Sequence, residues 1–165
     1  GSEMCIRDRH STSGNIEINI IQPNIKQTDK WDRELAQVNL NKLISATIEM
    51  LNKRSDGEKM VYSADIARVE SGTTITWIPT SKGHNVHFIV GPDGWELPKK
   101  SKNNKEVAIT FDTPGVYLYQ CTPHASMGMI ALVVVGGDTS NKDAIAKIKA
   151  MGKSKKKLPK LLEQL

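Results

Sequence analysis

Four side chains that bind soft transition metals lie within nine residues in the C-terminal half of the chain. They are the thiol of Cys121, the imidazole of His124 and the thioethers of Met127 and Met129. A second imidazole, that of His84, comes from a segment well upstream. Two histidines and one cysteine with a weak axial methionine form a blue-copper ligand set, because soft sulfur suits Cu(I) and imidazole suits Cu(II). The residues therefore predict one copper ion that exchanges single electrons.

The segments on either side of this loop are expected to be strands that hold it. Residues 116–120 and 129–135 are rich in β-branched and aromatic side chains. Pro123 lacks a backbone donor and stiffens the turn between them. Asn85, next to His84, is a candidate to hydrogen-bond to the loop from outside the ligand set. The site is thus predicted to form where two loops meet at one end of a sheet.

Each of these residues also has a more ordinary explanation. A single buried cysteine or methionine is usually a hydrophobic core residue, and a histidine at a strand end is usually a satisfied polar group. Zinc accepts the same ligand atoms, so residue types alone leave zinc open. The spacing of all the residues together favours copper.

Short β-rich runs separated by turn signals extend through residues 46–138, which we interpret as one β-sandwich domain. The expected strands are residues 47–51, 65–70, 73–78, 86–90, 106–111, 116–120 and 129–135.

The pattern changes to a helical one in residues 139–165, which are expected to pack on the sandwich. Ser140 and Asp143 have the spacing of a capping box, and they predict a helix that ends at Gly152. Its apolar face would consist of Ile145, Ile148 and Met151. A second short helix is predicted from the spacing of Leu158, Leu161, Leu162 and Leu165.

The beginning of the chain does not follow this pattern. Residues 1–9 resemble the in-frame translation of a sequencing adapter, so we interpret them, with Cys5, as an artefact. Residues 10–45 are interpreted as an N-terminal extension, either disordered or mistranslated upstream sequence. Within it, residues 15–21 alternate like a strand and residues 31–44 fit a weak amphipathic helix.

The net charge of +5 comes mainly from the C-terminal tail. Residues 139–165 have eight basic and two acidic residues, whereas residues 46–138 have nine and ten. No aromatic platform accompanies the basic tail, so we expect no nucleic-acid partner. No apolar run reaches the length of a membrane span, so we expect no membrane association. We expect a monomer.

Two segments resemble those of pseudoazurins, bacterial proteins of the cupredoxin family. They are T-S-K-G-H-N-V at residues 80–86 and C-T-P-H-A-S-M-G-M at residues 121–129, and the resemblance extends from about residue 47 to residue 165. It implies a mainly β fold, a cupredoxin-like Greek-key β-sandwich with two short C-terminal helices. The implied copper ligands are His84, Cys121, His124 and axial Met129, and Met60 would pack near the exposed imidazole.

The resemblance also implies a function. Pseudoazurins are periplasmic electron shuttles, and a transient partner such as copper-containing nitrite reductase is implied here. The implied docking face consists of Lys53, Lys82, Lys99, Lys100, Lys102, Ala125 and Met127. Gln120 and Ala125 depart from the family, which often has a lysine and an aromatic residue at these positions.

Other functions remain as alternatives. The protein could donate electrons to a different periplasmic oxidase or dehydrogenase, as amicyanin and plastocyanin do for their own partners. Copper transport or storage is less expected, because an exchangeable site usually offers more sulfur ligands and greater exposure. An enzyme is not expected, because a catalytic copper would need further histidines and only His10 and His87 remain.

Overall fold

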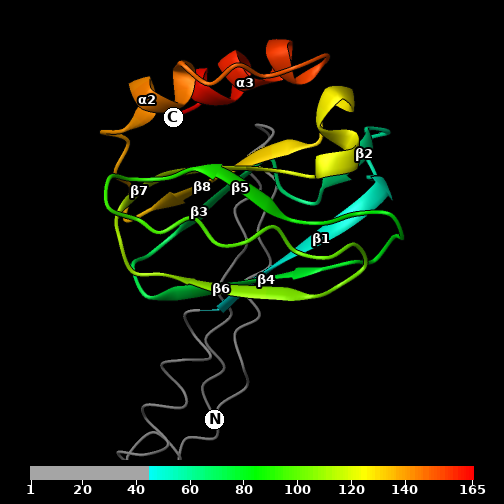
Figure 1. The fold of residues 1–165 in the computed structure, drawn as a ribbon, viewed down its shortest axis with the longest axis horizontal. Coiled ribbons are helices and arrows are strands. Elements are labelled where there is room, and N and C mark those ends of the chain that lie inside the picture. The colour runs from blue at the N-terminus through cyan, green and yellow to red at the C-terminus, as the bar shows by residue number, and fades with distance from the viewer. Residues whose placement is uncertain (1–44) are drawn as a thin grey trace, which may run out of the picture.

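Residues 45–165 are described by the computed structural model. The expected strand at residues 15–21 and the expected helix at residues 31–44 lie outside them, as do residues 1–9. The described part is a sandwich of two four-stranded sheets with helices over one of them (Figure 1). No helix among residues 45–165 is long and apolar enough to cross a membrane.

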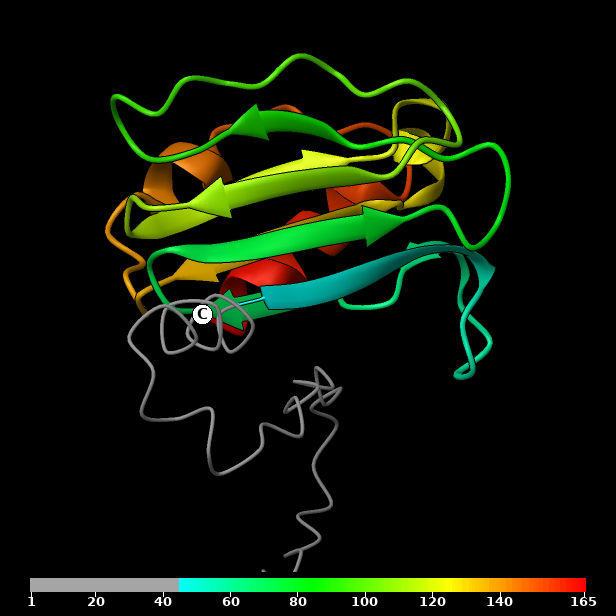
Figure 2. The ribbon, with the colours of Figure 1, turned by 90° about the horizontal axis from the view of Figure 1, so that it is seen from below.

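The first sheet forms one outer face of the sandwich. Its strands are β1 (Ser45–Lys53), β2 (Lys59–Tyr62), β4 (Thr73–Ile78) and β6 (Val107–Phe111). They lie in the order β2-β1-β4-β6. β1 pairs antiparallel with β2 and parallel with β4, and β4 pairs antiparallel with β6. Seen from below, the helices lie behind both sheets, so no helix of residues 45–165 covers the outer face of this sheet (Figure 2).

The second sheet lies between the first sheet and the helices. Its strands are β3 (Ile66–Val69), β5 (His87–Val90), β7 (Gly115–Gln120) and β8 (Ile130–Val135). They lie in the order β3-β8-β7-β5, with β3 parallel to β8 and the other pairs antiparallel. The expected sandwich is therefore confirmed.

The core between the sheets is largely aromatic. β1 alternates along its length and turns Ala46, Ile48 and Met50 inward. The ring of Trp77 lies at the centre, 5.3 Å from that of Tyr119 between centroids. Large rings in edge-to-face contact bury much apolar surface and fix the distance between the sheets. This rigid core supports the loops at the end of the sandwich.

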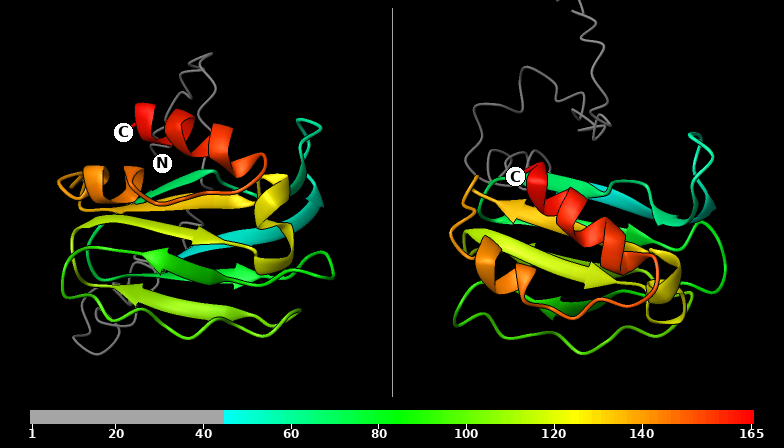
Figure 3. Two further views of the ribbon diagram at one scale, coloured as in Figure 1. Left: turned by 45° about the horizontal axis from the view of Figure 1, so that its top comes forward. Right: turned by 90° about the horizontal axis from the view of Figure 1, so that it is seen from above.

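The helices explain why β8 is buried along its whole length. One face of β8 contacts the core between the sheets, and the other is covered by α2 (Lys142–Ala146) and α3 (Ser154–Glu163) (Figure 3). Ile145 from α2 and Leu158, Leu161 and Leu162 from α3 pack on this outer face. Burial of each such side chain stabilises the fold by about 1.5–3 kcal/mol.

Three expectations about secondary structure are wrong. β2 was not expected. The first C-terminal helix does not reach Gly152 but ends at Ala146, and Met151 is 69% exposed. The capping box does not form, because the helix begins after Asn141, whose side chain instead bonds to both backbone groups of Val116 at 2.8 Å. The second helix is confirmed as α3.

Candidate metal centre

The loop between β7 and β8 forms a short 3-10 helix, η2 (Thr122–Met127). Pro123 lies in its first turn, where the missing N–H leaves no helical hydrogen bond unmade. Gly128 ends it with φ of +104°, a conformation that glycine adopts without a Cβ penalty. The amide of His124 donates to the carbonyl of Cys121 at 3.1 Å, so both side chains leave the same turn.

His84 reaches this loop from the connection between β4 and β5. The Sγ atom of Cys121 lies 3.6 Å from His84 Nδ1 and 3.4 Å from His124 Nδ1. The three ligand atoms all lie within 4.8 Å of one another. Bonds of about 2.0 Å to nitrogen and about 2.3 Å to sulfur that meet at about 120° would place the two atoms about 3.7 Å apart. The observed distances fit one ion held among the three atoms.

Asn52 fixes the tautomer of the His84 imidazole. The Nε2 atom of His84 lies 2.9 Å from Oδ1 of Asn52. Because an amide oxygen only accepts, Nε2 carries the proton and Nδ1 keeps its lone pair for a metal. Asn52 was not identified from the sequence as a site residue. Its signal was the M-L-N-K segment at residues 50–53, which belongs to the resemblance to pseudoazurins.

Asn85 joins the two loops, as expected. Its Oδ1 accepts the backbone N–H of Thr122 at 2.8 Å, and its Nδ2 donates to Thr122 Oγ1 at 3.3 Å. Its own carbonyl accepts the hydroxyl of Tyr62 at 2.8 Å. The side chain of Asn85 is buried, so its bonds to Thr122 are partly shielded from competing water. The loop of Cys121 is therefore fixed to the strand connection that carries His84.

Burial sets the protonation of the two innermost residues. It lowers the pKa of His84, and the neighbouring His124 lowers it further. Burial raises the pKa of the Cys121 thiol, although backbone N–H groups of Asn85 and His124 oppose this. At neutral pH the imidazole of His84 is therefore neutral, whereas the thiol keeps its proton until a metal displaces it.

The three methionines differ in their surroundings. Met129 is fully buried, and its carbonyl accepts the amide of Cys121 at 3.0 Å. Met127 is 45% exposed, as suits a residue on a docking face. Met60 is partly buried against the core cluster that includes Cys121 and Met129. Its contact with the imidazole of His124 stays a prediction.

The expected docking residues are exposed with one exception. The exposed ones are Lys53, Lys82, Lys99, Lys100, Lys102 and Met127. The assignment of Ala125 to the docking face stays a prediction, although Ala125 is only 9% exposed. This low exposure arises because its side of η2 faces α3, where the hydroxyl of Ser154 donates to the Ala125 carbonyl at 2.5 Å.

The loop that carries Lys100 and Lys102 is hydrogen-bonded to the loop that carries His84. Asn104 accepts the amide of Gly83 at 2.6 Å through Oδ1, and its own amide donates to the carbonyl of His84 at 2.9 Å. The hydroxyl of Ser101 accepts the amide of Val86 at 2.9 Å. No motif or spacing pointed to Asn104 or Ser101 as site residues. They hold Lys100 and Lys102 at a fixed place beside the site.

Comparisons with known proteins agree with this geometry. The family model of copper-binding proteins of the plastocyanin/azurin family matches residues 48–136. The chain is 38% identical to pseudoazurin from Methylorubrum extorquens over 120 residues, which cover 72% of this chain and 80% of that protein. It is 39% identical to pseudoazurin from Paracoccus pantotrophus, with 72% and 81% covered.

A solved structure extends the agreement to the fold. The native pseudoazurin of Hyphomicrobium denitrificans matches with a TM-score of 0.68 at 36% identity, covering 73% of this chain and 98% of that one. In the present chain the thiol of Cys121 and the imidazoles of His84 and His124 converge, and sulfur with imidazole is a donor set that suits copper. The chain belongs to the plastocyanin/azurin family of copper-binding proteins, as a pseudoazurin-like type 1 copper electron carrier that is not an enzyme.

Proposed function

We propose that His84 Nδ1, Cys121 Sγ and His124 Nδ1 hold the copper, with Met129 as a weak axial ligand. The single observation that supports this assignment is the convergence of the first three atoms within 4.8 Å. Bound copper supplies a one-electron couple between Cu(I) and Cu(II). The role of the protein is to keep the same ligand positions in both oxidation states.

The hydrogen bonds around the site support such rigidity. Asn52 orients the ring of His84, and Asn85 fixes the loop of Cys121. Such outer partners set ligand orientation and typically change metal affinity by about 10–100-fold when removed. A site that cannot rearrange exchanges an electron with little reorganisation of its ligands.

We propose that the electron passes through His124 to a periplasmic redox partner, such as copper-containing nitrite reductase. His124 is half-buried, and the exposed residues of η2 around it are Thr122, Pro123, Ser126 and Met127. The exposed lysines at positions 53, 82, 99, 100 and 102 would supply the charged rim. A small apolar centre with a charged rim suits a complex that must dissociate after each transfer. The similarity to pseudoazurins supports both the periplasmic location and the kind of partner.

The copper assignment is tested by adding Cu(II) to the purified protein. We expect an intense thiolate-to-copper absorption band at the red end of the visible spectrum. The band should be lost in Cys121→Ser, while Cys5→Ser serves as the matched control and should keep it. A protein that stays colourless with Cu(II), or a band that survives in Cys121→Ser, would contradict the assignment.

The docking face is tested by charge reversal. Lys82→Glu combined with Lys100→Glu should slow electron transfer to nitrite reductase and weaken its dependence on salt, because attraction between exposed charges is screened. Unchanged kinetics would contradict this face without affecting the copper assignment.

A further inference from the structure

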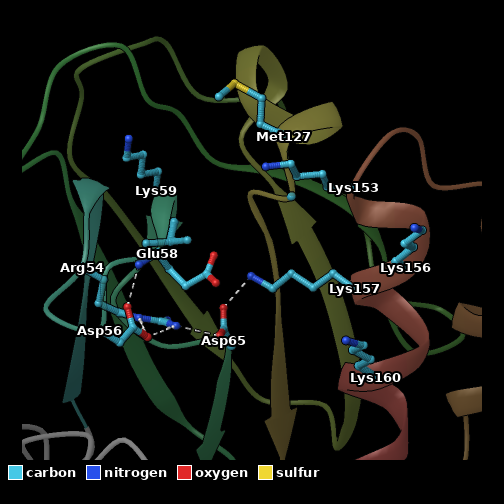
Figure 4. Close-up of a pocket in the computed structure, with 12 residues that line it drawn as sticks. Arg54, Asp56, Glu58, Lys59, Asp65, Met127, Lys153, Lys156, Lys157 and Lys160 are labelled. Carbon is cyan, nitrogen blue, oxygen red and sulfur yellow. Dashed lines mark hydrogen bonds and ion pairs between the residues drawn. The ribbon is translucent and has the colours of Figure 1, made fainter.

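A groove of about 500 Å³ runs from the copper-binding loop along one side of α3 (Figure 4). Met127 and Gly128 line its end at η2. One wall comes from the β1–β2 turn and the other from α3. Its charged residues are Arg54, Asp56, Glu58, Lys59, Asp65, Lys153, Lys156, Lys157 and Lys160. We call it the lysine groove. None of its lysines belongs to the docking face discussed above.

Two of the three acidic residues of the lysine groove form ion pairs with basic residues of the same groove. Arg54 pairs with Asp56 at 2.7 Å and with Asp65 at 3.1 Å. Lys157 pairs with the same Asp65 at 2.6 Å and so links α3, through Asp65, to Arg54 of the β1–β2 turn, as Figure 4 shows. Only Glu58 among the acidic residues has no such pair within residues 45–165. The floor of the groove is thus neutralised.

The remaining lysines of the groove are exposed, and within the described part of the chain none of them forms an ion pair. They are Lys59, Lys153, Lys156 and Lys160. Three of these lie with Lys157 at the spacing i, i+3, i+4 and i+7 around α3. Like charges at i and i+4 destabilise a helix. Local helix energetics does not explain this stripe, and an anionic occupant would remove the repulsion.

The lysine groove is also fixed to the copper-binding loop. The amide of Lys153 donates to the carbonyl of Ser126 at 2.8 Å, and the hydroxyl of Ser154 donates to that of Ala125. Figure 4 shows the side chain of Lys153 reaching toward Met127. An anionic group held by Lys153 would therefore lie against the exposed end of η2.

We propose that the lysine groove receives a carboxylate-rich segment of the redox partner. Four unpaired lysines from two walls match several carboxylates better than one small anion. The lysines of α3 span about 10 Å at 1.5 Å per residue, which is the length of a short extended segment. Exposed ion pairs are individually weak and screened by salt, so such a contact can steer a partner and still release it. This inference rests on the electron-carrier function proposed above.

The test uses the copper-loaded protein reduced to Cu(I) and hexaglutamate as the probe. Two-dimensional NMR of the ¹⁵N-labelled protein should show fast-exchange shifts at the amides of Gly128, Lys153 and Lys157. The shifts should diminish at high salt. Lys59→Glu combined with Lys153→Glu, one residue from each wall, should weaken binding about ten-fold. Glu58→Gln should strengthen it about three-fold, because it removes the unpaired negative charge.

The matched control is Lys142→Glu combined with Lys147→Glu, which makes the same charge change at the first residue of α2 and at the residue that follows this helix. It should bind hexaglutamate as the wild type does. Equal weakening in this control, or shifts confined to residues near Lys82 and Lys100, would overturn the proposal. The visible band of the same protein before reduction, in the Cu(II) form, should be unchanged in every variant, and its retention separates failure of the groove from failure of the copper function.

Discussion

The side chain of Asn85 binds Thr122 through two hydrogen bonds, one to its amide at 2.8 Å and one to its hydroxyl at 3.3 Å. Thr122 follows the cysteine of the metal centre directly. These bonds join the loop of His84 to the loop of Cys121, and the two bonded residues are 37 residues apart in the chain. The metal centre therefore depends on this contact for its shape before any metal binds.

Asn85→Ala should destabilise the metal-free protein by about 1–3 kcal/mol, because the amide of Thr122 would be left unpaired in a partly buried place. Denaturant unfolding of the metal-free protein measures the change. Thr122→Val removes only the hydroxyl contact and should cost less than Asn85→Ala. Equal losses in the two variants would contradict the main role given to the amide bond.

Asn52→Leu should lower copper affinity about 10–100-fold, because the ring of His84 loses the acceptor that fixes its tautomer. Competition with a chelator measures the affinity. Asn52→Asp keeps an acceptor oxygen at the same place, so most of the copper affinity should be retained. Wild-type affinity in Asn52→Leu would show that the ring is oriented by packing alone.

Copper binding should release about one proton per ion at neutral pH. The pKa of the Cys121 thiol is raised by burial, so the thiol is protonated in the metal-free protein, whereas the lowered pKa of His84 leaves its imidazole neutral. A pH indicator in weak buffer measures the release. Cys121→Ser should release much less, and the same release from both proteins would contradict the prediction.

His87 should make the metal-free protein less stable in mild acid. Burial lowers its pKa, and Lys100 lowers it further. A histidine with a lowered folded pKa binds more protons when unfolded, so stability falls as the pH falls below the unfolded pKa of about 6.5 and levels off below the folded pKa. In His87→Gln, the free energy of unfolding should vary less between neutral pH and mild acid. The pKa of His84 is lowered too, so a smaller dependence should remain.

Gly152→Ala should destabilise the fold by more than Gly137→Ala does. Both glycines have positive φ, +57° and +66°, which costs a residue with a Cβ about 1–2 kcal/mol. At Gly152 the added Cβ would also lie 2.2 Å from the carbonyl oxygen of Ser126, whereas at Gly137 nothing lies within 4 Å. Thermal unfolding compares the two variants. Equal shifts would mean that α3 can move away from η2 without loss.

Most of the sandwich could be predicted because its strands carry their own signals. The strand at residues 73–78 matches β4 at both ends, and the apolar run at 129–135 corresponds to β8, which is buried on both faces. β2 was missed because it has only four residues, and two of these are Lys59 and Met60, with Met60 at a positive φ of +52°. In these four residues apolar and polar side chains do not alternate, so the strand has no recognisable sequence pattern.

The errors at the C-terminal end have a different origin. Asn141 and Ala125 are both engaged by residues far away in the sequence, Asn141 by Val116 and Ala125 by Ser154. Local spacing suggested a helix cap at Ser140, whereas the resemblance to pseudoazurins implied the docking role of Ala125. Tertiary contacts engage Asn141 and bury most of Ala125. The metal centre was easier to predict, because the residue types themselves limit its chemistry. The domain boundaries at residues 9, 45 and 138 stay predictions.

The bonds from Lys153 and Ser154 to η2 connect the C-terminal helix to the metal loop. A metal that stabilises the loop should therefore also stabilise the packing of α3 against η2. Backbone amides in the first turn of α3, remote from the ligands, should consequently exchange more slowly with deuterium in the loaded protein. Exchange at the start of α3 would thus report whether the site holds metal.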